Sequence, residues 1–157
     1  MPAVPRLALG LVATCLACAT LPAWAGQVEV TWVEPDLYAD AGRSVVDRER
    51  TMGALGEHLK RWGRLLPDGQ TLKLDVLDVD LAGEIEPYGW HQVRILRGRA
   101  DWPHLKLRYT LQAGDRTLKS GEAELADMHY RLGDRGSELG FEKRMLDQWF
   151  RNTFAAQ

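Results

Sequence analysis

The chain has 157 residues, of which 45% are apolar and 27% are charged. This length fits one globular domain, and the composition is too polar for a protein with several membrane spans and too apolar for a disordered chain. The formal net charge is −2, from 20 basic and 22 acidic residues, so there is no basic excess of the kind that favours nucleic-acid binding.

The first 25 residues differ in composition from the rest of the chain. Residues 7–21 are an apolar stretch that follows a single basic residue, Arg6, and precedes a small-x-small sequence at residues 23–25. This pattern predicts a secretory signal peptide that is cleaved after Ala25. We therefore expect a periplasmic protein made of residues 26–157, with no stable membrane span after cleavage.

Two alternatives to a cleaved signal peptide are open. One is an uncleaved membrane anchor, although residues 7–21 are shorter than the roughly 20 residues that a spanning helix needs. The other is a lipoprotein, because Cys15 and Cys18 lie in this segment, although the residues before each fit a lipidation site poorly. Both cysteines precede the cleavage site, so the mature chain would have no disulfide and would depend on its core for stability.

Apolar periodicity predicts a strand and then a helix at the start of the mature chain. Alternating apolar residues over 28–32 indicate a half-buried strand. From about residue 44 to residue 66 the spacing becomes helical, with Ser44 as the N-cap. The apolar stripe of this helix comprises Val45, Met52, Leu55, Leu59, Trp62 and Leu66. Glycine weakens a helix by up to about 1 kcal/mol relative to alanine, and small residues beside the stripe would allow close approach to a sheet. The helix contains Gly53, Gly56 and Gly63.

The remaining sequence predicts four more strands and a terminal helix. The strands fall at about residues 72–81, 93–95, 105–111 and 116–126. The apolar parity changes near Val76-Leu77, which indicates a β-bulge or a strand buried on both faces. The terminal helix has an apolar stripe of Leu139, Leu146, Trp149, Phe150 and Phe154. Its Asp147 is spaced for helical ion pairs with Lys143 and Arg151.

The order strand, helix, four-strand meander, helix predicts a single α+β domain over residues 26–157. The simplest packing places both helices on one face of a mostly antiparallel sheet. The first helix can also serve as a crossover that makes the first two strands parallel neighbours.

The first candidate ligand site is acidic and contains Asp78, Asp80 and Glu84. Asp78-Val79-Asp80 resembles the opening of a calcium loop, but Ala82 stands at the third ligand position and Gly89 where the bidentate glutamate belongs. A solvated or salt-bridged strand face is the favoured alternative. We expect no metal and no other cofactor.

The second candidate site is aromatic and basic. Residues 84–91 predict a loop that carries Tyr88 and Trp90, two amphipathic rings of a kind common at recognition sites. The favoured alternative is that Trp90 folds inward and caps the core. Arg94, with Lys106 and Arg108, gives a basic strand face for an anionic ligand, against ordinary pairing with Glu122 and Glu124.

Five blocks of the mature chain are similar to a known family. They lie at residues 28–40, 66–83, 92–98, 121–130 and 142–150, and the sequence DVDLAG at 78–83 is among the most specific. Together they resemble the bacterial domain-of-unknown-function 3016 family of small exported proteins. The resemblance implies an exported single domain and carries no activity, ligand or catalytic residue.

Motifs for the common nucleophilic, metallopeptidase, phosphate-binding and dithiol chemistries do not occur in the sequence. We therefore favour a non-enzymatic binding or accessory module of the bacterial cell envelope, with an envelope protein or a small ligand as its partner. The alternatives are an enzyme with an unorthodox carboxylate site around Asp78 and Asp80, and a structural docking protein.

Overall fold

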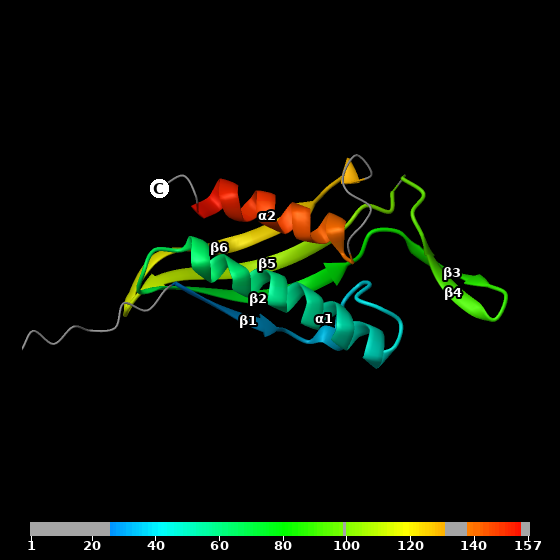
Figure 1. The fold of residues 1–157 in the computed structure, drawn as a ribbon, viewed down its shortest axis with the longest axis horizontal. Coiled ribbons are helices and arrows are strands. Elements are labelled where there is room, and N and C mark those ends of the chain that lie inside the picture. The colour runs from blue at the N-terminus through cyan, green and yellow to red at the C-terminus, as the bar shows by residue number, and fades with distance from the viewer. Residues whose placement is uncertain (1–25, 99, 131–137, 155–157) are drawn as a thin grey trace, which may run out of the picture.

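The computed structural model describes residues 26–98, 100–130 and 138–154, so the predicted signal peptide and its cleavage site lie outside the described residues. The fold is α+β, with a mixed four-stranded sheet, a separate two-stranded sheet and two α-helices (Figure 1). Within these residues, no helix is long and apolar enough to span a membrane.

The strands and helices follow one another in the order β1 (Gln27–Trp32), α1 (Val45–Lys60), β2 (Gln70–Asp80), β3 (Glu84–Tyr88), β4 (His91–Ile95), β5 (His104–Ala113), β6 (Arg116–Ala126) and α2 (Gly140–Phe154). Two short 3-10 helices flank α1, namely η1 (Pro35–Leu37) and η2 (Arg61–Leu65).

The four-stranded sheet has the order β1-β2-β5-β6. β1 and β2 are parallel, with α1 as the crossover between them, and the other two pairs are antiparallel. The predicted parallel pair is therefore confirmed. The register of β2 against β5 shifts between Val76 and Asp78, which confirms the predicted bulge.

The predicted four-strand meander is wrong in one respect. β3 and β4 pair with each other and leave the main sheet as a hairpin, while β2 pairs directly with β5 (Figure 1). We call this hairpin, residues 84–95, the arm. The predicted loop at residues 84–91 is in fact β3, a tight turn and the start of β4. Apolar alternation shows which face of a strand is apolar, but it does not show which strand lies beside it.

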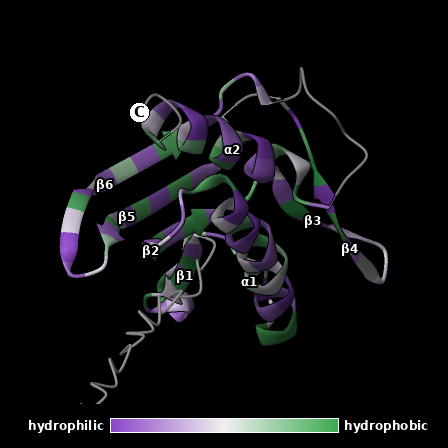
Figure 2. Ribbon diagram, turned by 60° about the vertical axis from the view of Figure 1, so that its left-hand side comes forward, coloured by the Kyte–Doolittle hydropathy of each residue, from purple (hydrophilic) through white to green (hydrophobic). Residues whose placement is uncertain are grey.

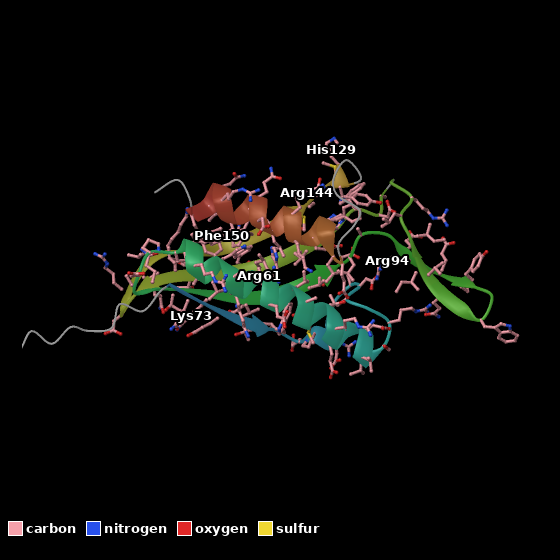
Figure 3. All side chains as sticks on the ribbon, in the orientation of Figure 1. Arg61, Lys73, Arg94, His129, Arg144 and Phe150 are labelled. Carbon is pink, nitrogen blue, oxygen red and sulfur yellow. The ribbon has the colours of Figure 1, made fainter. Side chains whose placement is uncertain are left out.

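Both α-helices of the described residues pack on the same face of the main sheet, and the hydrophobic core lies between the layers. The core includes Leu55 and Leu59 of α1, Leu146 and Phe150 of α2, and the inward-facing side chains of β2 and β5. Apolar and polar residues alternate along the strands, as the banding in Figure 2 shows. Between the helices, Trp62 stacks on Phe150 with ring centroids 4.5 Å apart, and Figure 3 shows Phe150 in this interior.

The start of α1 is set by a capping box. The Ser44 side chain accepts the Asp47 N–H, and the Asp47 carboxylate accepts the Ser44 N–H, as the predicted N-cap requires. The predicted apolar stripe is wrong at its first member, because Val45 is 59% exposed. The predicted helix ends as an α-helix at Lys60 and continues as η2, which buries Trp62.

Two of the three glycines lie close to the sheet, as their size suggested. A Cβ on Gly63 would lie 2.5 Å from the carbonyl oxygen of Gly26, and one on Gly56 would lie 3.6 Å from the Trp32 ring. A Cβ on Gly53 would meet nothing within 4 Å. Close approach therefore explains Gly63, whereas Gly56 has room for a methyl group in ordinary contact with Trp32 and Gly53 has no neighbour at all.

Candidate functional site

The base of the arm is held to the body by Arg94 of β4. Its Nη1 atom donates a hydrogen bond to the Gly83 carbonyl at 2.8 Å and pairs with Asp40 Oδ2 at 2.9 Å. The Ala82 carbonyl lies 3.3 Å from the same nitrogen. Figure 3 shows Arg94 where the arm meets the body. One guanidinium nitrogen thus joins the arm, the β2–β3 connection and the loop before α1.

Asp40 is positioned by a short parallel bridge to the end of β2. Its N–H donates to the Val79 carbonyl at 2.9 Å, and its own carbonyl accepts the Leu81 N–H at 3.0 Å. Its Oδ1 atom accepts the Gly42 N–H at 3.0 Å, which leaves Oδ2 for Arg94. The loop carboxylate is therefore fixed by backbone bonds before it meets the arginine.

A buried carboxylate, Glu142, lies on the other side of this junction. Glu142 is only 2% exposed, and its Oε1 atom accepts the Ala82 N–H at 2.9 Å. Burial raises the pKa of Glu142, while the backbone hydrogen bonds and the nearby Arg94 oppose that rise. The residue lies in the first turn of α2, where the helix dipole favours negative charge.

Arg94 lies between two hollows that share Leu81, Arg94 and Leu139 in their walls. The first, of about 250 Å³, reaches Glu142 and the start of α2. The second, of about 290 Å³, reaches the start of α1. Leu139 has a φ of 56°, a left-handed conformation that costs a non-glycine residue about 1 kcal/mol or more. It caps α2 in this conformation, since its carbonyl accepts the Lys143 N–H.

Asp78 and Asp80 lie on the face of β2 away from the helices. Asp78 Oδ1 accepts the N–H groups of Ala39 and Val79, each at 2.9 Å. Burial raises the pKa of Asp80, and the charges of Asp40 and Asp78 raise it further, whereas His104 and Arg94 lower it. His104 Nδ1 lies 3.8 Å from Asp80 Oδ2. In the described part of the chain, no group of three His, Cys, Asp or Glu side chains is placed to hold a metal ion.

The outer face of the sheet also carries ordinary cross-strand ion pairs. Arg108 donates from Nε and Nη2 to Glu122 Oε1 at 3.1 and 3.0 Å, and its Nη1 lies 3.8 Å from Asp75 Oδ2. The pairing interpretation of Arg108 is therefore supported. The predicted basic face that joined Arg94 to Arg108 is wrong, because β4 is not part of this sheet.

The tip of the arm is a two-residue turn, Gly89-Trp90. Gly89 has a φ of 59°, and a glycine at the first turn position suits a tight hairpin. Trp90 is fully exposed, at 101% of its reference area, and Tyr88 is 73% exposed. The expectation that Trp90 caps the core is wrong, because the arm leaves the sheet and no core lies beneath its tip.

The six residues predicted as ligand contacts do not form one site. They occupy the outer sheet face (Asp78, Asp80), the exposed base of β3 (Glu84), the tip of the arm (Tyr88, Trp90) and the junction with the body (Arg94). Glu84 lies 4.0 Å from Arg97.

Sequence reasoning missed Asp40 and Glu142. The partnership of Asp40 with Arg94 spans 54 positions and leaves no local pattern. Glu142 did leave a local pattern in the sequence, because it precedes Leu146 by four residues and so lies on the apolar face of α2.

The family model of DUF3016, a protein of unknown function, matches residues 26–152. The chain belongs to this family. The match confirms the resemblance of the five sequence blocks and covers α1, the main sheet, the arm and all but the last two residues of α2. Comparison with curated proteins and with solved structures gives no match.

Proposed function

We propose that this DUF3016 protein is an exported, non-enzymatic binding module of the bacterial cell envelope, and that it docks a partner protein through the tip of its arm. The observation that carries the proposal is the full exposure of Trp90, next to the largely exposed Tyr88, at the end of a hairpin outside the main sheet.

An isolated two-stranded hairpin is only marginally stable in water. This arm is fixed at its base, where Gly83 N–H donates to the Asp101 carbonyl at 2.8 Å and Gly98 N–H donates to Tyr130 Oη at 3.1 Å. Arg94 adds the ion pair to Asp40. The fold thus exposes two large aromatic rings on a supported hairpin, and tryptophan and tyrosine are among the residues most enriched in interface hot spots.

Binding fits this surface better than catalysis by the acidic residues. Asp78 is occupied by two backbone N–H groups, and Asp40 by Arg94 and the Gly42 N–H. The two hollows at the junction are lined by Arg94 and not by Asp78 or Asp80. Export is supported by the leader pattern and by a family match that starts at residue 26.

The experiment is site-specific photo-crosslinking in cells. A photoreactive amino acid replaces Trp90 in one variant and Leu37 in the other, because Leu37 is a second large apolar residue with 76% exposure, on η1. We expect a discrete protein adduct from position 90 and none from position 37. In parallel, Trp90→Ala should remove capture of that partner and leave the denaturation midpoint unchanged. Equal adducts from both positions, or none from position 90, would contradict the proposal.

A further inference from the structure

The hollow of about 290 Å³ lies between the start of α1 and the inner face of the arm. Its charged lining consists of Arg43, Arg50, Arg94 and Asp47. Its apolar lining is Leu81, Ile85 and Leu139. Tyr88 and Trp90 do not line it, so the hollow is separate from the proposed docking tip.

Positive charge exceeds negative charge in this hollow, although the whole chain is net negative. Asp47 is engaged with Ser44, whose hydrogen bonds lower the pKa of the Asp47 carboxyl, with a smaller contribution from the charge of Arg50. Over residues 26–98, 100–130 and 138–154, neither Arg43 nor Arg50 has a carboxylate within ion-pair distance. Asp40 neutralises the charge of Arg94, and Asp47 offsets one of the other two arginines. One net positive charge therefore remains at the hollow.

Arg94 also offers a free edge. Its contacts to Asp40 and to the carbonyls of Ala82 and Gly83 all use Nη1. Its Nε and Nη2 atoms have no hydrogen-bond partner among the described residues. These two N–H groups lie side by side on the guanidinium plane and match the two oxygens of a carboxylate. The guanidinium is held rigidly by Nη1, so this edge is preorganised.

We propose that this hollow binds a small organic carboxylate. The Nε–Nη2 edge of Arg94 holds one carboxylate group in a bidentate contact, and Arg43 and Arg50 supply further positive charge for a second acidic group. Leu81, Ile85 and Leu139 contact the carbon chain of the ligand. Typical small-molecule pockets measure about 300–1,000 Å³, so a hollow at the lower limit of that range selects a ligand of a few carbons.

Calorimetric titration of the purified protein at low ionic strength tests this inference. The titrants are acetate, succinate and citrate, with succinamide as the neutral counterpart of succinate and inorganic phosphate as a different oxyanion. The binding variant is Arg43→Gln/Arg50→Gln, since both side chains are exposed and have no ion-pair partner among the described residues, so their loss should not disturb the fold. The matched control is Arg61→Gln, an exposed arginine on η2 at the far end of α1.

We expect saturable binding of succinate or citrate and no binding of succinamide. The double variant should weaken that binding at least tenfold, and Arg61→Gln should change it less than twofold. Binding of no carboxylate, equal binding by the double variant, or tighter binding of phosphate than of every carboxylate would overturn the proposal. None of these results depends on Trp90, so failure here is distinguishable from failure of the docking proposal.

Discussion

Trp62 and Asp147 join the segment after α1 to α2, because Trp62 Nε1 donates a hydrogen bond to Asp147 Oδ1 at 2.8 Å. The same oxygen lies 2.8 Å from His58 Nε2 on α1. Trp62 is 2% exposed, so its N–H depends on this acceptor. A single carboxylate oxygen of α2 therefore contacts ring nitrogens from both α1 and η2.

Replacing Asp147 with leucine should lower the free energy of unfolding by about 1–3 kcal/mol, because a buried N–H is left without an acceptor. Urea unfolding of Asp147→Leu beside the parent measures the loss. The control is Gln148→Leu, at the neighbouring exposed position on α2, which should shift the value by less than about 0.5 kcal/mol. Equal midpoints for the two variants would show that the bond does not stabilise the helix pair.

The role of Asp147 shows where local patterns fail. Its spacing predicts ion pairs with Lys143 and Arg151, but Lys143 Nζ donates instead to the Glu138 carbonyl at 2.7 Å. Exposed helical ion pairs contribute only about 0.3–0.5 kcal/mol, so a hydrogen bond to a buried tryptophan from another segment outweighs them. No pattern within α2 could have revealed that partner.

The fold itself was largely predictable from periodicity. The alternation over 28–32, the helical spacing after Ser44 and the parity change at Val76-Leu77 each correspond to a feature of the structure. The separation of the arm was not predictable, because Val93 and Ile95 alternate as they would in any strand of the main sheet. For the same reason the exposure of Trp90 was missed, since large apolar rings are usually buried.

The packing of α2 predicts the effect of removing Trp149. Its ring lies 5.4 Å from that of Tyr109 and 5.6 Å from that of Phe154, between centroids. Removal of a buried tryptophan costs about 3–5 kcal/mol, and the half-buried Trp149 should reach the lower end of that range. Urea unfolding of Trp149→Ala checks this value, with Arg151→Ala on the exposed side of α2 as a near-neutral control. A Trp149→Ala midpoint equal to that of the parent would contradict the packing.

Glu142 makes stability depend on pH. Burial raises its pKa in the folded state, so between the unfolded and folded pKa values the native state binds more protons than the unfolded state. The contribution of Glu142 to the free energy of unfolding is therefore fully present below its unfolded-state pKa, and it is lost as the pH rises through its folded-state pKa. Asp80, whose pKa is also raised, acts with the same sign.

Glu142→Gln separates this effect from the other groups, because the amide oxygen can still accept the Ala82 N–H. The stability of the variant relative to the parent should increase as the pH rises from about 4.5, the ordinary pKa of a glutamate, to about 7. Urea unfolding at several pH values in this window measures the difference. Glu138→Gln, near the start of the same helix and exposed, is the control and should show no such trend. A relative stability that falls with rising pH would reverse the sign and contradict the argument.

The leader pattern predicts that the mature protein begins at Gly26. Intact-mass measurement of the protein isolated from its native envelope should match residues 26–157 without modification. A mass that includes residues 1–25 would support the anchor instead, and lipid on Cys15 or Cys18 would support the lipoprotein.

Gly53 and Gly63 should respond in opposite directions to alanine. Gly53 lies within α1, and a Cβ added there would have no neighbour within 4 Å, so Gly53→Ala should raise the free energy of unfolding by about 0.5–1 kcal/mol through helix propensity. At Gly63 the Cβ would lie 2.5 Å from the backbone oxygen of Gly26, and backbone cannot move as a flexible side chain can. Gly63→Ala should therefore lower the free energy of unfolding by about 1–3 kcal/mol. Because the two variants add the same methyl group, paired urea unfolding isolates the effect of contact with Gly26, the residue just before β1. Shifts of the same sign would show that Gly63 is not retained for close packing.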